Sequence, residues 1–249
     1  LKQMGSIVRI TEVLQSGPAR MPLNLSDWTI RALETEFKGK NGKLKFGLSM
    51  HPKAQRDLKK ILNTCKNTLK KSLGNIRFIN KDFNNLSSVQ AFHGKLLTEN
   101  GMELHLFSGE SKIYLSKTLA IQDFEWYSKR DYDRPAKSAK NGMFPPKLAQ
   151  ILINLAGTTP ETVIYDPFCG SGTVLQEAWL MDRESLGSDL SEKMVSDSIQ
   201  NLHWLKEKAG FREEIPRVFQ ADATQLTPEQ LPQKPFAIVT ETWLGPILT

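Results

Sequence analysis

The stretch "DPFCGSGTV", residues 166–174, decides the fold of the second half of this chain. The apolar residues 163–165 before it are typical of a short buried β-strand, and residues 173–178 after it read as the start of a helix. Gly170 and Gly172 therefore lie in a strand-to-helix turn. Glycines in such a turn let the backbone approach a ligand closely and leave amide groups pointing at its polar atoms.

Acidic residues recur at the ends of the predicted strands. Residues 185–189, 217–222 and 236–240 read as further strands, and helical segments 173–182 and 191–208 separate the first three strands of the series. This β-α-β-α-β order predicts a parallel sheet with right-handed crossovers, whose ligands bind outside the carboxyl ends of the strands. We therefore expect one edge of the sheet to carry all four acids: Asp166, Asp189, Asp222 and Glu241.

These acids and glycines suit a cofactor that contains a nucleoside. A carboxylate after the second strand can accept both hydroxyls of a ribose, and one after the third strand can accept an amino proton of adenine. The dinucleotide fingerprint G-x-G-x-x-G requires a third glycine where this chain has Leu175, which argues against NAD. The alternative is that the glycines serve a tight turn for steric reasons alone.

The composition is that of a globular protein with a basic surplus. The 249 residues carry a formal net charge of +6, with a pI near 9.2, which favours a polyanionic partner. A run of about 18 apolar residues is absent, so no membrane span is expected, and the first residues lack the apolar core of a signal peptide. Cys65 and Cys169 are too few for a disulfide framework or a zinc site, which predicts a reducing, cytoplasmic location. The four histidines are scattered in sequence and indicate no metal site: His51, His93, His105 and His203.

Residues 51–77 form a strongly basic segment. Apolar residues recur there at helical spacing: Leu58, Ile61, Leu62, Cys65 and Leu69. Basic residues surround them and face a single acid, Asp57: Lys53, Arg56, Lys59, Lys60, Lys66, Lys70, Lys71 and Arg77. The pattern predicts an amphipathic helix with its apolar stripe on a core. Its outer face is either a solvated helix surface or a face that binds phosphates.

The N-terminal half reads as a separate α/β domain. Residues 6–10, 44–48, 77–79 and 102–107 are strand-like, and residues 86–92 resemble the start of a helix with serines able to cap it. Residues 123–146, rich in charge, aromatic residues and proline, are typical of a connection, and Pro146 suits the first position of a helix over 147–156. We predict a domain over 1–120, a linker over 121–146 and a second domain over 147–249.

Three stretches carry a resemblance to a known family. "DPFCGSGTVLQEA" (166–178) resembles the cofactor loop of class I S-adenosylmethionine-dependent methyltransferases that act on exocyclic amines of nucleic acids. "IQDFEWYSKRDYDRPAKSAKNGMFPPKLAQILINLAG" (121–157) and "LSSVQAFHGKLL" (86–97) resemble the THUMP-domain tRNA guanine-N2 methyltransferases. The resemblance implies a THUMP-containing domain that binds tRNA, followed by a Rossmann-like methyltransferase domain that uses S-adenosylmethionine.

The resemblance also assigns residues to the cofactor. It places Asp166, Gly170 and Gly172 around the methionine part, with Phe168 of the same loop among the cofactor-binding residues. Asp189 would hold the ribose and Asp222 the adenine. Residues 144–147 match a segment that lies beside the cofactor in the family, or they are simply a proline-rich helix start. The lysines expected to contact tRNA phosphates are Lys53, Lys59, Lys60, Lys66 and Lys70.

The expected catalytic motif departs from the family pattern. Members of this branch carry Asp-Pro-Pro-Tyr after the fourth strand, and alignment of "VTDPPYG" with this chain yields "VTETWLG" at 239–245. Glu241 then replaces the acid that draws on the amine proton, unless it merely ends a strand. Trp243 is a candidate for stacking on a base, although one position away from the family's aromatic residue.

The chain ends soon after the fourth predicted strand. A complete class I sheet has seven strands, so we expect either a fragment or completion of the sheet by another segment or a second chain. An incomplete sheet exposes an apolar edge, which predicts weak activity or association of this chain alone. Two further functions compete with the tRNA enzyme: a DNA amino-methyltransferase, and a catalytically impaired protein that binds S-adenosylmethionine and RNA.

Overall fold

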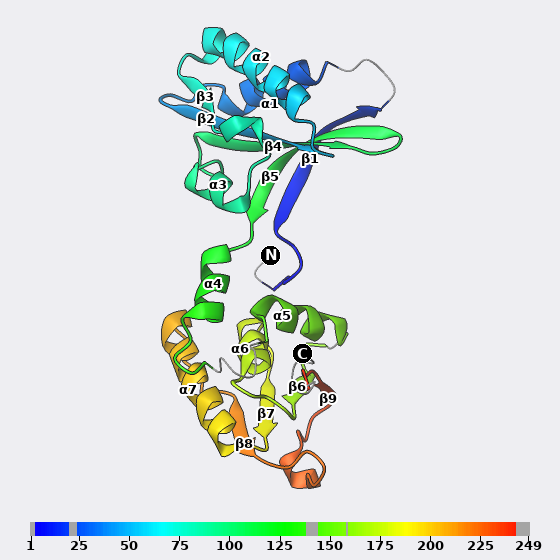
Figure 1. Cartoon of the computed structure of the whole chain (residues 1–249), viewed down its shortest axis with the longest axis vertical. Coiled ribbons are helices and arrows are strands. Elements are labelled where there is room, and N and C mark those ends of the chain that lie inside the picture. Colours follow the sequence, from blue (N-terminus) through cyan, green and yellow to red (C-terminus); the bar gives the residue numbers. More distant parts are fainter. Residues whose placement is uncertain (1–2, 20–23, 138–143, 158, 243–249) are drawn as a thin grey trace, which may run out of the picture. The chain divides into compact units, whose positions relative to one another are not determined.

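The computed structural model describes residues 3–19, 24–137, 144–157 and 159–242 (Figure 1). The chain divides into two compact units, one over Ile7–Gln122 and the other beginning at Asp123. Residues 3–6 belong to the second unit. Each unit has its own sheet and its own apolar core, so each is described by itself.

The first unit is built on a mixed sheet of five strands. In spatial order the strands are β1 (Arg9–Pro18), β5 (Lys112–Ile121), β4 (Gly101–Ser108), β2 (Leu44–His51) and β3 (Ile76–Phe78). β4, β2 and β3 run parallel to one another, whereas β5 is antiparallel to both β4 and β1. The sequence predicted β2, β3 and β4 closely, but it placed β1 too early and missed β5.

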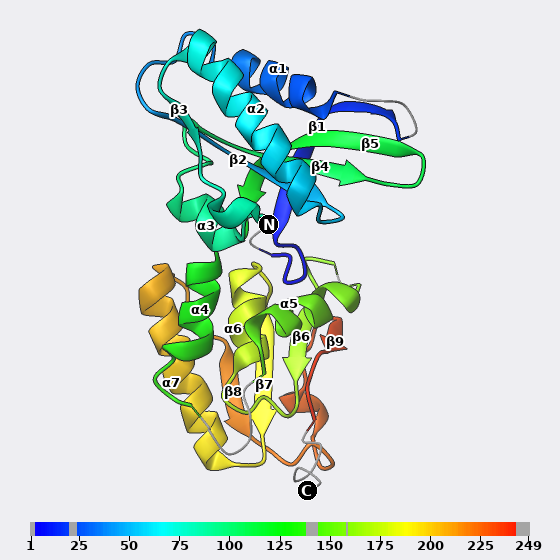
Figure 2. The ribbon, with the colours of Figure 1, turned by 45° about the horizontal axis from the view of Figure 1, so that its top comes forward.

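Two helices cover one face of this sheet (Figure 2). They are α1 (Leu25–Phe37), which the sequence reading missed, and α2 (Gln55–Leu73). The predicted apolar stripe of α2 is confirmed, because all five of its residues are buried: Leu58, Ile61, Leu62, Cys65 and Leu69. They pack with alternate residues of the strands, among them Phe46, Leu48 and Leu104. Burial of this stripe is what makes a lysine-rich segment helical here.

The opposite face of the same sheet is partly covered by α3 (Ser88–His93) and the residues around it. Ser87 and Gln90 form a capping box at the start of this helix. Leu86 and Leu96 form a small apolar cluster there and lie against Gly47 of β2. A Cβ at Gly47 would lie 2.2 Å from Cδ1 of Leu86, so any larger residue there would have to displace this side chain. The 3-10 helix η1 (Lys81–Phe83) precedes this segment.

The second unit contains a sheet of four parallel strands. Their spatial order is β8 (Arg217–Gln220), β7 (Ser185–Asp189), β6 (Val163–Asp166) and β9 (Phe236–Ile238). The chain thus moves from β6 through β7 to β8 and then returns to the other side of β6. In an open parallel sheet, the crevice at such a reversal is where ligands bind.

Three helices lie on one face of this sheet (Figure 2). They are α5 (Pro146–Leu155), α6 (Thr173–Leu180) and α7 (Glu192–Ala209). α5 and α6 pack on Ile164 of β6, and α7 packs with α6 near Val218 of β8. The other face, with Tyr165 and Leu186, is partly covered by the segment that contains η2 (Pro228–Gln230). No helix in the described parts of the chain combines the length and the apolar character needed to cross a membrane.

The segment predicted as a linker, residues 121–146, contains a helix of the second unit instead. α4 (Phe124–Tyr132) begins at Asp123, whose carboxylate accepts the N–H of Trp126. Arg130 of α4 is 2% exposed and forms a bidentate pair with Glu177 of α6, at 2.6 and 3.1 Å. Arg130, one of the charges of this segment, is therefore paired inside the unit, because a buried guanidinium needs a carboxylate.

Candidate functional site

Asp166 and Asp189 lie at neighbouring strand ends on the carboxyl edge of the four-stranded sheet. Asp166 ends β6 and pairs with Gly187, and Asp189 ends β7 and pairs with Gln220. The N–H of Ala221 donates to the carbonyl of Asp189 at 3.0 Å, which brings the segment after β8 to the same place. Asp222 follows directly. The predicted gathering of these acids at one edge therefore agrees with the observed register.

The glycine loop between β6 and α6 is fastened to β7. The N–H of Gly170 donates to Oδ2 of Asp189 at 2.9 Å, and the N–H of Cys169 donates to the carbonyl of Ser188, also at 2.9 Å. The N–H of Gly172 closes a turn on the carbonyl of Cys169 at 2.8 Å. The loop that follows β6 is thus bonded to the carboxylate of Asp189 at the end of β7.

The two glycines of the loop are needed for different reasons. Both have positive φ, +52° at Gly170 and +82° at Gly172, which favours glycine. A Cβ at Gly170 would meet nothing within 4 Å, so the space beside this residue is open. A Cβ at Gly172 would lie 2.3 Å from Oγ of Ser198, so this glycine permits close packing against α7.

Asp189 keeps capacity for further hydrogen bonds. Its Oδ2 accepts from Gly170, and its Oδ1 accepts the N–H of Ser191 at 2.9 Å. Each carboxylate oxygen has two acceptor positions, and the side chain is only half-buried. Asp189 can therefore accept two hydroxyls of a ligand without losing the bonds that hold it.

Asp166 is almost completely buried. The residue is 2% exposed, and its carboxylate accepts the N–H of Phe168 at 3.1 Å. Burial, and to a smaller extent the charge of Asp189, raise the pKa of Asp166 from its ordinary value of 3.8 to about 7. A cation placed beside it would favour its ionised form. Phe168 itself is 47% exposed and presents an aromatic ring at the loop.

Asp222 is the least constrained of the three aspartates. Its Oδ1 accepts the hydroxyl of Thr224 at 2.7 Å and the N–H of the same residue at 2.9 Å. These two bonds lower the pKa of Asp222, so it is ionised at neutral pH. The side chain is half-buried and retains acceptor capacity for a ligand.

Glu241 lies just beyond the strand that borders the reversal of the sheet. β9 pairs with β6, and the N–H of Val239 continues that pairing with the carbonyl of Tyr165 at 3.0 Å. Glu241 follows two residues later and is exposed. Trp243, the residue predicted to stack on a base, lies outside the described residues.

The domain that carries these residues matches a known family. Residues 134–242 match the model described as UPF0020, RMKL-like, methyltransferase domain. Over these residues the chain is similar to RMKL-like methyltransferase domains. The prediction of a Rossmann-like methyltransferase domain is thereby confirmed, with the parallel sheet and its glycine loop at the centre of the matched residues.

Named relatives are found among archaeal proteins. The chain is 29% identical over 145 residues to a tRNA (guanine(10)-N2)-dimethyltransferase of Methanocaldococcus jannaschii, a match that covers 57% of this chain and 40% of the relative. It is 30% identical over 169 residues to a protein of the same name from Pyrococcus abyssi, covering 64% and 48%. The chain thus spans less than half the length of these curated relatives.

Two crystal structures share the mixed α/β fold. One is a predicted N6-adenine-specific DNA methylase from Listeria monocytogenes, with a TM-score of 0.53 and 15% identity, covering 97% of this chain and 67% of that one. The other is a possible methylase from Clostridium difficile 630, with a TM-score of 0.53 and 19% identity, covering 96% and 67%. At these identities the likeness shows the fold alone.

The lysines predicted to contact phosphates belong to the first unit and not to the methyltransferase domain. Lys53 precedes α2, and the other four lie on it: Lys59, Lys60, Lys66 and Lys70. All but Lys66, which is half-buried, are exposed. The ammonium groups of Lys59 and Lys66 lie 5.2 and 5.7 Å from the ring centres of Phe83 and Phe78. The set is therefore a solvent-facing basic surface with two members anchored on aromatic rings.

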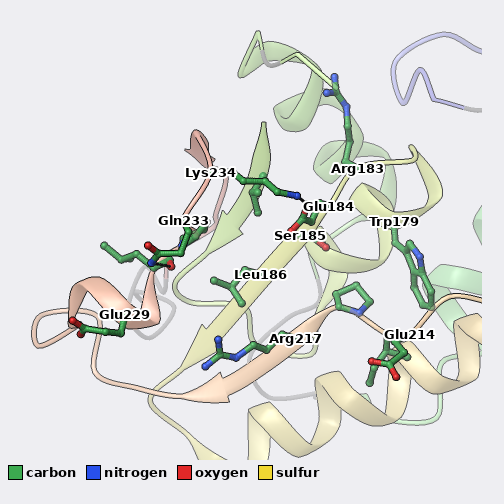
Figure 3. A pocket seen from close by; sticks show the side chains of 15 residues that line it. Trp179, Arg183, Glu184, Ser185, Leu186, Glu214, Arg217, Glu229, Gln233 and Lys234 are labelled. Atoms are coloured by element: carbon green, nitrogen blue, oxygen red, sulfur yellow. Dashed lines mark hydrogen bonds and ion pairs between the residues drawn. The ribbon is translucent and has the colours of Figure 1, made fainter. Parts of the chain in front are cut away.

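The methyltransferase domain also contains a cavity of about 490 Å³ (Figure 3). Its lining includes the first residues of three strands, Val163, Ser185 and Arg217, so it opens at the amino edge of the sheet. Figure 3 shows the side chain of Lys234 directed at Glu184, with which it forms a 2.6 Å ion pair. This cavity is therefore separate from the carboxyl edge, where the candidate cofactor residues lie.

The histidines are less scattered in space than in sequence. His105 of β4 and His51 of β2 place ring nitrogens 3.4 Å apart, and their rings stack with centres separated by 5.6 Å. The parallel pairing of the strands sets His51 opposite Phe107, two residues beyond His105, which makes the histidines diagonal neighbours. Burial, and to a smaller extent the charges of His105 and Arg9, lower the pKa of His51.

The raised pKa of Asp166 predicts a specific dependence of stability on pH. A carboxyl group whose folded pKa exceeds its unfolded pKa favours the native state below pH 3.8, and this contribution is lost as pH rises toward 7. Asp166→Asn removes the titration. The variant should therefore gain unfolding free energy relative to the wild type between pH 5 and pH 8, by on the order of a few kcal/mol.

Denaturant titrations without ligand, repeated over the pH range, measure the unfolding free energy of the wild type and Asp166→Asn. Asp222→Asn is the matched control in the same titrations. The pKa of Asp222 is lowered, so its stabilising contribution is lost only as pH falls through the acidic range. Its stability difference from the wild type should stay constant between pH 5 and pH 8. A constant difference for Asp166→Asn as well would show that the Asp166 carboxyl does not titrate in this window.

Proposed function

We propose that this protein transfers a methyl group from S-adenosylmethionine to the exocyclic N2 amine of a guanine in tRNA. The observation that carries the proposal is the carboxyl edge of the methyltransferase domain, where an open glycine loop is hydrogen-bonded to Asp189, with Asp166 and Asp222 beside it. The names of the two archaeal relatives supply the substrate class.

The residues of this edge fit the chemical groups of S-adenosylmethionine. Asp189 has two free acceptor positions for the ribose hydroxyls, and Asp222 can accept the amino group of adenine. Asp166, buried and with a raised pKa, suits the cationic methionine part, whose charge would favour the carboxylate. When bound, S-adenosylmethionine supplies an electrophilic methyl group on its sulfonium.

Glu241 is the proposed acceptor for the amine of guanine. A carboxylate in hydrogen-bond contact with that amine would draw on its proton while the nitrogen lone pair forms a bond to the methyl carbon, as the bond from that carbon to the sulfonium sulfur breaks and S-adenosylhomocysteine leaves. The exposure of Glu241 beside the reversal of the sheet leaves it free to meet a substrate. The proton released from the amine passes to Glu241 or to water, and the chain's own residues form no covalent bond to the substrate.

The first unit is proposed to bind the tRNA. The basic surface of α2, together with Lys53, is suited to phosphates because their neutralisation releases counterions and stabilises the complex without reading sequence. This α/β unit is the proposed THUMP-containing domain, and the protein is proposed to act in the cytoplasm. Of the five lysines, Lys66 is the least exposed, so we expect it to contribute least.

A second candidate function is binding without transfer. It is favoured by Glu241 and Thr242, which stand where the family pattern has aspartate and proline. The longer glutamate side chain moves the carboxylate by about one carbon–carbon bond, and Thr242 lacks the rigid ring of proline. A transfer assay separates this candidate from the enzyme.

Incubation of the chain with methyl-labelled S-adenosylmethionine and unmodified tRNA tests the proposed reaction. Label should appear on guanine N2, and Glu241→Ala should lower kcat about 10²- to 10⁴-fold while the affinity for S-adenosylhomocysteine is unchanged. Glu229 is an exposed glutamate of η2, and Glu229→Ala is the control, which should keep full activity. Cofactor and tRNA binding without any transferred label would favour the binding protein instead, and label on duplex DNA would favour a DNA enzyme.

Neutralising Lys53, Lys60 and Lys70 to glutamine tests the tRNA surface. Binding should weaken, and the slope of log affinity against log salt should fall by about two to three if each lysine neutralises one phosphate. The control changes Lys38, Lys43 and Lys95, three exposed lysines of the same unit outside α2, and alters the net charge equally. Filter binding over a salt series measures both. Equal losses in the two triple variants would show that binding follows overall charge and not the α2 surface.

A further inference from the structure

Asn201 of α7 is fully buried, and its side chain forms hydrogen bonds with backbone groups of two distant segments. Its Nδ2 donates to the carbonyl of Ser171 at 2.9 Å and to the carbonyl of Ala136 at 3.0 Å. Its Oδ1 accepts the N–H of Ala136 at 3.0 Å. Ser171 stands between the two glycines of the loop, and Ala136 belongs to the segment that follows α4.

The surroundings of Asn201 explain why an amide is needed there. The buried face of α7 consists of Ser198, Asn201, Leu202 and Leu205, at helical spacing. Leu202 packs with Cys169 and Leu175 on either side of the loop. An apolar residue at position 201 would leave the two buried main-chain groups of Ala136 without these bonds, each at a cost of about 1–3 kcal/mol, and would also free the partly buried carbonyl of Ser171.

The bond to Ser171 controls the geometry of the loop. A peptide unit is planar, so the direction of the Ser171 carbonyl also sets the direction of the Gly172 N–H. The loop cannot rely on regular secondary structure for this, because both glycines have positive φ. Asn201 holds the Ser171 carbonyl at 2.9 Å, while Nε2 of Gln176 approaches it only to 3.5 Å.

A second contact ties the same two segments together. Nη1 of Arg134 donates to Oγ1 of Thr173 at 2.6 Å, and Arg134 is 1% exposed. Thr173 is the first residue of α6, immediately after Gly172. Residues 134–136 thus form a strap that is bonded to α6 through Arg134 and, through Asn201, to the loop itself.

We infer that Asn201 is a positioning residue for the cofactor, which acts by fixing the Ser171–Gly172 peptide of the loop against the strap of residues 134–136. The inference rests on the proposed use of S-adenosylmethionine. Asn201 need not touch the ligand, because the loop that it holds carries the open space beside Gly170 and the hydrogen bond from Gly170 to Asp189. The sequence of residues 191–208 predicts a helix but gives no signal for this role of Asn201.

The first unit offers a matched control for this residue. Asn80 is 6% exposed, and its side-chain amide also forms hydrogen bonds with the backbone. Its Oδ1 accepts the N–H of Leu48 at 3.1 Å. Its Nδ2 donates to the carbonyls of Leu48 and Asn84 at 2.8 and 2.7 Å. Asn201→Asp and Asn80→Asp replace the same donor group by an oxygen set against two carbonyls. Both variants should lose stability for the same reason.

The experiment compares the two full-length variants by calorimetric titration with S-adenosylhomocysteine and by amide hydrogen exchange of residues 168–174 without ligand. Asn201→Asp should weaken binding at least tenfold and speed exchange in the loop at least tenfold. Asn80→Asp should lower the melting temperature but leave both quantities at their wild-type values. Asn201→Ser, whose short hydroxyl cannot span both segments, should shift both quantities in the same direction by a smaller factor and serves if Asn201→Asp does not fold.

Two results would count against the inference or its basis, and they are distinguishable. Wild-type exchange rates in the loop of the Asn201 variants, together with wild-type affinity, would reduce Asn201 to a general stabilising role and overturn the inference. A wild-type chain that binds no S-adenosylhomocysteine would contradict the proposed function. The exchange comparison would then still decide whether Asn201 holds the loop.

Discussion

The hydrogen bond from the N–H of Gly170 to the carboxylate of Asp189 is the interaction on which the candidate site depends. It ties the first strand-to-helix turn to the end of the neighbouring strand, and it exists only because β6 and β7 are parallel and in register. A shift of either strand by one residue would turn the acid to the other face of the sheet. The glycine loop and the acids therefore form a single unit and not four independent features.

Buried polar contacts behind the loop keep it in place. Glu177 of α6 pairs with Arg130 and accepts Nε2 of Gln150 at 2.7 Å, and Tyr127 donates to the same Gln150. Burial raises the pKa of Glu177, and the guanidinium of Arg130 counteracts that effect. Loss of one partner in such a pair costs about 3–5 kcal/mol, so α4, α5 and α6 are strongly held together. A loop that must keep an open path beside a ligand benefits from a rigid helix directly after it.

Periodicity and local signals were enough to predict α2, α3, α5 and the β6-to-β8 series, because each places apolar residues on one face or carries its own cap. They could not reveal α4, because its residue Arg130 is buried only through an ion pair with Glu177, which lies 47 residues away in the sequence. The same limit hid Asn201 and the proximity of His51 to His105, since both depend on pairing between distant segments. The roles given to Asp166, Phe168, Asp189, Asp222 and Glu241, and the completion of the sheet by another segment or chain, stay predictions.

A crystal structure of the chain with S-adenosylhomocysteine is the most direct test of the central claim, that one edge of the parallel sheet is built for an adenosyl group. The ribose hydroxyls should lie within hydrogen-bond distance of the Asp189 carboxylate, and the adenine amino group should lie beside Asp222, with the ligand passing over the open side of Gly170. A ligand bound elsewhere, for instance in the cavity at the amino edge, would contradict the claim.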